Sequence, residues 1–344
     1  MTTSYYDHKK ATFFVVLLIG LFALSWAREP LAENYWSRND PNSPNRIDHS
    51  LWNQLLGAML VPYEDVKDQV SSSKWDCRTT DSRIPKCDIG VGSTNNLKGV
   101  NLVTYKYFKP EFVYFIRSYL DSMSDVPILS YRKDEQLAYW LNVHNALVVL
   151  KIYEEYPVES VADLRDTPRI KPKKPIVWVK NAITIEGRSL SIRDIEQDII
   201  FKNWKNPNVI YGLFDGSVSS PTLRKSAYLG SQVHAQLAAN AENFVNSPRV
   251  LRFRSEVAKV SSAYGWAHAL FDEPEEILVH IADLRPSLAN RMRAVRRVRE
   301  TFYDYDLAAF EPKSDLQDRM ALDRIVDFNG GSVGGGVFGG GGGN

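Results

Sequence analysis

The chain has 344 residues, of which 44% are hydrophobic and 24% charged, so it is long and apolar enough to bury a sizeable core. Its 42 Lys and Arg side chains nearly balance 41 Asp and Glu side chains, which leaves a formal charge of +1 at pH 7. This balance gives no global field that would attract nucleic acid. We therefore expect one large globular domain with short appendages and no nucleic-acid partner.

The first element of the chain is an export segment. Two lysines precede a charge-free run from Ala11 to Ala27, whose apolar centre is FFVVLLIGLFAL. A core of this length suits a signal peptide, and Ser25-Trp26-Ala27 supplies small residues for cleavage after Ala27. Residues 1–27 are thus interpreted as a signal peptide, with retention as a single-pass membrane anchor as the alternative. Either way, we expect a secreted or extracytoplasmic protein.

A linker and a disulfide-bearing insertion follow. Residues 28–45 are polar and contain prolines, which predicts a linker, and the main domain is expected over residues 46–325. Within it, the polar insertion 71–97 contains the only two cysteines, Cys77 and Cys87. An exported chain meets an oxidising environment, so they are expected to form a disulfide. The alternative is half of a zinc site, but this stretch offers no further Cys or His to complete it.

Helices are expected to dominate the first half of the domain. SLWNQLLGAML, residues 50–60, has apolar residues at helical spacing, and Asp48 or Ser50 can cap it. A strand-like piece, VNLVTYKY, precedes a second helix from about Pro110 to Met123. A third helix runs from residues 131–134 to about 156, where Pro157 stops it.

The second half mixes strands with helices. IVWVKNAITIEG, residues 176–187, alternates with a period of two and predicts a β-hairpin, and Ser191 and Asp194 then cap a helix. NVIYGLF, residues 208–214, predicts a buried strand that leads into the turn DGSVSSPTLRKS. A helix over 229–246 and a strand over 249–255 follow. The fold class is therefore α+β: a helix-rich single domain with a small, mainly antiparallel sheet in the second half.

Two segments near the C-terminus have unusual compositions. RPSLANRMRAVRRVRE, residues 285–300, holds six arginines, for which a solvated helix face is favoured over a phosphate-binding stripe. Residues 329–344 hold ten of the twenty glycines. Their apolar surface is too small to offset the entropy of ordering, so this Gly-rich tail is expected to be disordered.

The third helix poses the main question about function. Its stretch AYWLNVHNALVVL is apolar on nearly every side, yet it contains Asn142, His144 and Asn145. Buried polar groups cost about 1–3 kcal/mol each when they lack hydrogen-bond partners. These three side chains must therefore find partners, either in a functional site or in the surrounding structure.

Six stretches of the chain resemble those of a known family. They are IDHSLWNQLL, VNLVTYKYF, DEQLAYWLNVHNALVV, SLSIRDIE, the turn ending SSPTLR, and FYDYDLAAF. In this order, over roughly residues 46–310, they are similar to the family known as domain of unknown function 547, which has exported bacterial members and plant members fused to coiled coils. The resemblance implies a shared fold and site geometry without a settled chemistry. A relationship to papain-like cysteine peptidases would suit the α+β architecture.

The chain departs from this family's pattern at the positions that thiol chemistry would need. The bacterial pattern commonly has two cysteines in the turn and a histidine directly after an Ile-Glu pair. Here Asp215 and Ser220 stand in place of the cysteines, and Gln197 stands in place of the histidine. Thiol catalysis is therefore not expected.

The remaining polar residues of these stretches suggest a cleft. His144, Glu196 and Ser220, or Ser219 in its place, could serve as base, orienting acid and nucleophile of a hydrolase acting on amide or ester bonds. The Asn residues could donate to an oxyanion, and Arg224 could hold a carboxylate. As a binding cleft, the site would be lined by Asn142, Asn145, Asp215, Ser219 and Arg224. No metal or other cofactor is implied by these residues.

Each of these residues also has a structural explanation. Buried Asn side chains can fix neighbouring backbone, turn hydroxyls can satisfy their own loop, and Glu196 could pair with Arg224. His234, His268 and His280 are expected to be ordinary surface or core histidines.

The replaced cysteines and histidine favour a non-catalytic domain that binds a peptide, glycan or protein. The hydrolase is the alternative. It requires a nitrogen of His144 within about 2.6–3.2 Å of a hydroxyl of Ser219 or Ser220.

Overall fold

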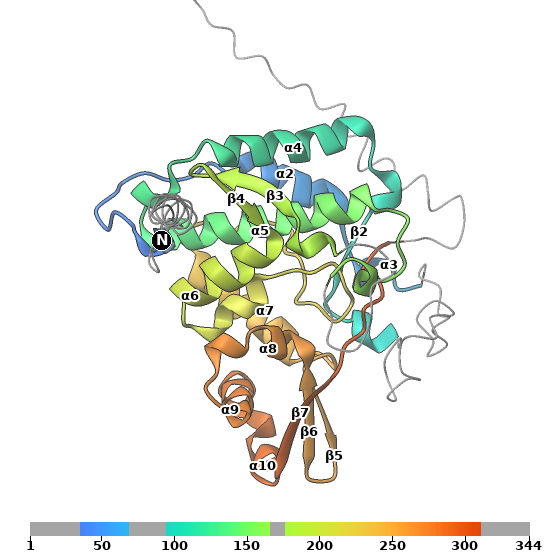
Figure 1. The fold of residues 1–344 in the computed structure, drawn as a ribbon. Coiled ribbons are helices and arrows are strands. Elements are labelled where there is room, and N and C mark those ends of the chain that lie inside the picture. The colour runs from blue at the N-terminus through green and yellow to red at the C-terminus, as the bar shows by residue number, and fades with distance from the viewer. Residues whose placement is uncertain (1–34, 69–93, 166–175, 311–344) are drawn as a thin grey trace, which may run out of the picture.

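The computed structural model describes residues 35–68, 94–165 and 176–310 (Figure 1). Helices predominate and the strands form small sheets, so the predicted α+β fold class is confirmed.

The helices and strands have the following bounds. The α-helices are α2 (Ser50–Met59), α3 (Tyr63–Val66), α4 (Pro110–Ser124), α5 (Lys133–Glu154), α6 (Phe201–Asn203), α7 (Val233–Val245), α8 (Ser262–Trp266), α9 (Pro274–Leu284) and α10 (Ala289–Arg293). The 3₁₀ helices are η1 (Tyr35–Ser37), η2 (Thr94–Leu97), η3 (Tyr105–Tyr107), η4 (Ile128–Ser130), η5 (Val161–Asp163), η6 (Val177–Val179), η8 (Pro207–Gly212), η9 (His268–Leu270) and η10 (Pro286–Leu288), and η7 (Asp194–Ile200) is a π-helix. The strands are β1 (Leu60–Pro62), β2 (Asn101–Val103), β3 (Asn181–Ile185), β4 (Arg188–Ser191), β5 (Leu251–Arg254), β6 (Val257–Ser261) and β7 (Arg297–Phe302).

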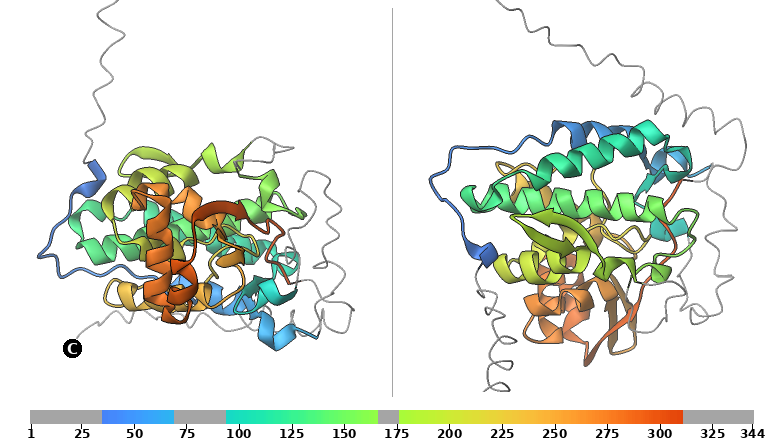
Figure 2. Two further views of the ribbon diagram at one scale, coloured as in Figure 1. Left: turned by 90° about the horizontal axis from the view of Figure 1, so that it is seen from below. Right: turned by 45° about the horizontal axis from the view of Figure 1, so that its top comes forward.

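These elements form a helical upper part and a lower part built around one sheet. Helices α2, α4 and α5 lie across the upper part, with the β3–β4 hairpin beside α4 (Figure 1). The sheet β5–β7 and helices α8, α9 and α10 form the lower part of the molecule in Figure 1 and in the right view of Figure 2. The site described below lies where the two parts meet.

Helix α5 is the centre of the core. Acidic residues occupy its first turn and Lys151 its last, which complements the helix dipole, and Pro157 follows its end. Every residue from Glu135 to Leu150 is buried, because α4, η7 and α7 pack around the helix. The third helix predicted from the sequence thus has no solvent-facing side over most of its length.

The strands form three small sheets rather than the single sheet expected in the second half. β1 pairs with β2 in the first half of the chain, and β3 pairs with β4, both antiparallel. In the third sheet β6 lies between antiparallel β5 and parallel β7. The pairing is mainly antiparallel, as expected.

The prediction of a strand over residues 208–214 is wrong, because most of this stretch forms the 3₁₀ helix η8. Pro207 suits the first helical turn, and the side chain of Asn206 accepts a hydrogen bond from the backbone N–H of Asn208 at 3.0 Å. The apolar run alone could not reveal this, since buried strands and buried helical turns look alike in sequence.

The hairpin lies later in the chain than predicted. Residues 177–179 form η6, and the turn between β3 and β4 is Glu186-Gly187, both with positive φ. The cap at Ser191 and Asp194 forms as expected. Asp194 Oδ2 accepts from the backbone N–H of Ser191 at 2.8 Å, and Ser191 Oγ accepts from that of Asp194 at 3.1 Å.

The Arg-rich stretch 285–300 does not form the predicted helix face. It passes through η10 and the short α10 and then enters strand β7. Parallel pairing with β6 places its last arginines on a sheet, where side chains alternate between two faces.

The segment after β7 returns to the upper part and joins three distant stretches. Single β-bridges link Asp306 to Ser160, Leu307 to Ser217 and Ala309 to Val103. The stretch FYDYDLAAF therefore holds the polar turn in place against the helical core.

The described residues begin at Tyr35, within the segment expected to be a linker, and some of this segment packs on the domain. Trp36 packs edge-on against Trp140 of α5 with ring centroids 5.2 Å apart, and Gln136 Nε2 donates to the carbonyl of Arg38 at 2.9 Å. The domain thus extends further toward the N-terminus than its expected start at Arg46.

Several expectations fall outside the described residues. They concern the export segment 1–27, most of the insertion 71–97 with its disulfide between Cys77 and Cys87, and the tail 329–344. Within residues 35–68, 94–165 and 176–310, no helix has the length and apolarity that crossing a membrane requires.

Gly216, which begins the turn beneath the C-terminal segment, offers a test of this packing. Its φ is +89°, and an added Cβ would lie 2.1 Å from Cδ1 of Ile152 in α5. We expect G216A to lower the free energy of unfolding by about 2–4 kcal/mol, from left-handed strain and overpacking together. G187A is the matched control, because φ is +71° there but nothing lies within 4 Å of the added Cβ. It should cost only about 1 kcal/mol in urea denaturation. Equal losses would contradict this packing.

Candidate functional site

Two members of the buried polar trio in α5 bind backbone. Asn142 Nδ2 donates to the carbonyl of Tyr228 at 2.8 Å, and Asn142 Oδ1 accepts from the N–H of the same residue at 2.9 Å. Asn145 Nδ2 donates to the carbonyl of Gly212 at 3.0 Å, and its Oδ1 accepts from the N–H of Phe214 at 3.1 Å. Both Asn side chains therefore bind neighbouring backbone, which is their expected structural role, and they fix the segments on either side of the polar turn.

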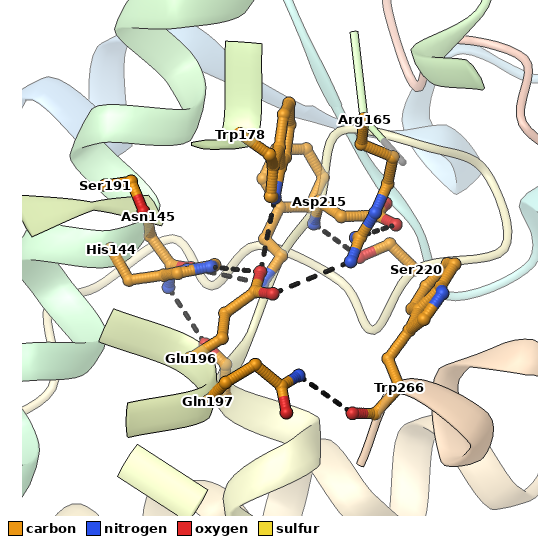
Figure 3. Close-up of polar contacts among 12 residues, drawn as sticks. His144, Asn145, Arg165, Trp178, Ser191, Glu196, Gln197, Asp215, Ser220 and Trp266 are labelled. Atoms are coloured by element: carbon orange, nitrogen blue, oxygen red, sulfur yellow. Dashed lines mark hydrogen bonds and ion pairs between the residues drawn. The ribbon is translucent and has the colours of Figure 1, made fainter. Parts of the chain in front are cut away.

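The third member, His144, uses both ring nitrogens. Its Nδ1 lies 3.0 Å from Asn145 Oδ1, and its Nε2 lies 2.9 Å from Glu196 Oε1 (Figure 3). The backbone partners of Asn145 fix its amide so that Oδ1 can only accept, and a carboxylate also only accepts. We infer that His144 donates from both nitrogens and carries two ring protons, since each nitrogen faces an acceptor.

Glu196 is held beneath the cleft by the π-helix η7, a rare form that often accompanies functional sites. Besides His144, its Oε1 accepts from Trp178 Nε1 at 3.3 Å, and its Oε2 lies 3.6 Å from Arg165 Nη2. The carboxylate is therefore shared between two cationic groups and one indole N–H.

Arg165 joins this carboxylate to a second one. Its Nη1 donates to Asp215 Oδ2 at 3.0 Å, and its guanidinium lies over the ring of Trp266, 3.8 Å from the ring centroid. Asp215 also accepts from the hydroxyl of Tyr303 at 2.8 Å and from the backbone and hydroxyl of Ser217. Two positive and two negative groups are thus buried together, so their charges balance.

The opposing effects of burial and of neighbouring charges decide whether Glu196 and Arg165 are ionised. Burial alone would raise the pKa of Glu196, but the Arg165 guanidinium and the His144 hydrogen bond outweigh it and hold this pKa below its usual value. Burial would likewise lower the pKa of Arg165, but Glu196 and Asp215 outweigh that effect and raise it. Both groups therefore remain charged at neutral pH despite their burial.

The turn serines do not meet His144. Ser220 Oγ accepts from the backbone N–H of Asp215 at 2.9 Å and donates to the carbonyl of Pro221 at 2.9 Å. Ser219 Oγ accepts from the N–H of Asp304 at 2.7 Å. Buried Arg249 holds the same turn by donating to the carbonyl of Ser220 at 2.7 Å. The hydroxyls thus serve the turn and the segment that packs on it.

Arg224 and Gln197 also lie apart from the charged network. Arg224 Nη1 binds the carbonyl of Gln236 and Oδ1 of Asn240, each at 3.3 Å, so the pairing of Arg224 with Glu196 considered above does not form. Gln197 Nε2 donates to the carbonyl of Trp266 at 2.9 Å, at the edge of the site (Figure 3).

Two spaces adjoin the network. An open cleft of about 360 Å³ is lined by Arg165, Trp178, Arg193, Glu196, Gln197, Gly265, Trp266 and His268. A cavity of about 30 Å³ shares Arg165, Glu196 and Trp266 with the cleft and is also lined by Asp215 and Tyr303. This volume suits a single water-sized group. Members of the charged network therefore line both the cleft and the cavity.

Residues 128–245 match the model of a family described as protein of unknown function, DUF547. The chain carries a DUF547 domain. No curated protein and no solved structure matches the chain.

The DUF547 domain supplies all four charged groups, His144, Arg165, Glu196 and Asp215. The aromatic residues that complete the site come partly from outside the match, since Trp266 and Tyr303 lie beyond residue 245. In this protein the site thus depends on the α8 region and on the segment after β7 as well as on the DUF547 domain.

Sequence reasoning missed the residues that organise the network, namely Arg165, Trp178, Trp266 and Tyr303. Arg165 follows the stretch VADL, and Tyr303 is the second residue of the family stretch FYDYDLAAF, but neither position by itself predicts an ion pair or a buried hydroxyl. Only the fold brings these separate segments to one place.

Three further histidines, His234, His268 and His280, have the ordinary environments expected of them. His234 is exposed and lies 3.0 Å from Asp134, His268 is exposed, and His280 contacts the hydroxyl of Tyr211 at 2.9 Å. In the part of the chain that the structure describes, no three His, Cys, Asp or Glu side chains gather as metal ligands would.

Substitution of Glu196 tests the network of the DUF547 domain. We expect E196Q to lower the free energy of unfolding at pH 7 by about 3–5 kcal/mol, because it leaves two buried cations with one carboxylate. Since the folded-state pKa of Glu196 lies below its unfolded value, the wild type should also lose stability as the pH falls below about 4.5, and E196Q should lose less. Urea denaturation between pH 3 and 7 measures both effects.

The matched control is D198N on the same π-helix. Asp198 pairs with Lys202, and both side chains are more than half exposed, so this change should cost at most about 1 kcal/mol. A loss for E196Q as small as that for D198N would show that the network contributes little to stability.

Proposed function

We propose that this protein is an exported, non-catalytic binding domain whose open cleft takes a peptide or glycan ligand through an oxygen acceptor. The observation that carries the proposal is a pair of buried donors at the cleft, Arg165 Nε and Trp266 Nε1. Neither has a hydrogen-bond partner among the described residues. Buried donors without acceptors are costly, so such groups often mark a site where a ligand or water completes the bonding.

The chemistry around these donors favours a carboxylate or carbonyl oxygen. Both donors belong to residues that line the cleft as well as the cavity of about 30 Å³, which has room for one oxygen atom. Arg193 and Gln197 add further polar groups along the cleft, and the indoles of Trp178 and Trp266 supply flat apolar walls. This combination of a few polar groups with aromatic walls is typical of a small-ligand site.

The hydrolase alternative has weaker support. A serine nucleophile needs a neighbouring base with a free nitrogen, but both nitrogens of His144 already face acceptors. Ser219 and Ser220 are 2% and 1% exposed, and their hydroxyls bond to backbone. A substrate in the cleft would therefore meet the charged network and the two tryptophans rather than a hydroxyl.

Titration with two small probes tests the proposal. Tri-alanine offers a free carboxylate and peptide carbonyls, and chitotriose offers acetamide carbonyls on a glycan. We expect one of them to change the tryptophan fluorescence saturably and to be recovered uncleaved. W266F keeps an aromatic ring over Arg165 but removes the Nε1 donor, so it should weaken binding by about three- to tenfold.

The control variant is W36F, because Trp36 packs on Trp140 rather than lining the cleft. It should bind like the wild type. Absence of saturable binding with both probes would count against the proposal. Cleavage of either probe that is lost in S220A would establish the hydrolase instead.

A further inference from the structure

The three-stranded sheet of the lower part carries cations on one of its faces. Paired residues of neighbouring strands lie on the same face of a sheet, and successive residues alternate between faces. In the observed register Arg252 pairs with Lys259, and Lys259 pairs with Arg299. In the adjacent row Arg254 pairs with Val257, and Val257 pairs with Arg297. Five cationic side chains therefore project from a single face.

The opposite face is the one that packs on the protein. Ala258 and Val260 of β6 are buried, and Phe253 of β5 lies beneath Arg291 of α10, with the guanidinium 4.3 Å from the ring centroid. Helices α8, α9 and α10 lie beside β7 (Figure 1), and α8 and α9 contact that strand. The cationic face thus points away from the packed face, and Arg254, Arg297 and Arg299 on it are exposed.

This face is far more positive than the chain as a whole, which has a formal charge of only +1. Its two rows contain five cations and Val257, without an acidic side chain. At the end of the sheet Glu256 is already paired with Arg296, the atoms lying 3.2 Å apart. Clustered like charges repel one another, and a partner of opposite charge would relieve this repulsion.

We propose that the cationic face of sheet β5–β7 binds the surface of a lipid bilayer that contains anionic lipids. Neighbouring strands lie about 4.8 Å apart, and side chains on one face recur about every 7 Å along a strand. The cations are therefore spread over an area in which they can contact several anionic lipid headgroups at once. A two-stranded β-ribbon can also enter a groove of DNA, so the test below includes a DNA duplex as a competing partner. The charge-free run near the N-terminus also predicts passage through a membrane, which favours lipid over nucleic acid as the anionic partner.

Co-sedimentation of the full-length protein with vesicles tests this. The measured quantity is a ratio of two affinities, for phosphatidylcholine vesicles with added phosphatidylglycerol and for the same vesicles without it. Any contribution of the apolar N-terminal run affects both affinities and cancels in the ratio. The test variant R254Q/R297Q/R299Q removes the three exposed cations and leaves Arg252 and Lys259, which are half-buried and make other interactions. Since each cation near an anionic surface strengthens binding roughly fivefold, we expect the ratio to fall about a hundredfold. Added salt should lower the wild-type ratio as well.

The matched control K106Q/R132Q/K225Q removes three exposed cations elsewhere and should keep the wild-type ratio within about threefold. Circular dichroism checks that both variants fold. Equal ratios for the two variants would overturn the proposal. It would also be overturned if a soluble DNA duplex bound the wild type more tightly than the vesicles and the test variant lost that binding, because the face would then serve a nucleic acid.

Discussion

The structure depends on the neutralisation of charges that are buried away from water. His144 pairs with Glu196, and Arg165 pairs with both Glu196 and Asp215, so removing any one of these groups would leave a largely buried charge uncompensated. These groups come from α5, the end of η5, the π-helix η7 and the polar turn, and Tyr303 adds a hydroxyl from the segment after β7. One electrostatic requirement therefore fixes five separate parts of the chain relative to one another.

The same network shapes the cleft above it. Because Glu196 and Asp215 restrain Arg165, its guanidinium stays over the ring of Trp266, while its Nε and the indole Nε1 have no acceptor among the described residues. The turn that would have to supply a nucleophile is instead fixed by Arg249, Asp304 and its own carbonyls. This arrangement is consistent with the proposed binding function, because it keeps the cleft of the DUF547 domain preorganised for a ligand.

Local patterns in the sequence predicted much of the fold. The bounds of α4, α5 and α7 and the cap at Ser191 and Asp194 follow from apolar spacing and capping residues, which act over a few positions. Predictions failed where a local pattern is ambiguous, as at η8, or where pairing is long-range, as in the parallel contact of β6 with β7. His144 and Glu196, considered as members of one group with a turn serine, do lie 2.9 Å apart, but neither Ser219 nor Ser220 joins them. Arg165, Trp178 and Trp266 could not be predicted, because only tertiary contacts make them partners of Glu196.

The measurement that tests this account most directly is the protonation of the His144 ring, observed by nitrogen-15 NMR of the folded protein at neutral pH. Exposed His268 serves as the internal reference, and loss of a signal in H144Q assigns the resonances. The account predicts that both ring nitrogens of His144 carry protons, because each donates to a fixed acceptor. A ring with one unprotonated nitrogen would contradict it, since that nitrogen could accept a proton from a nucleophile.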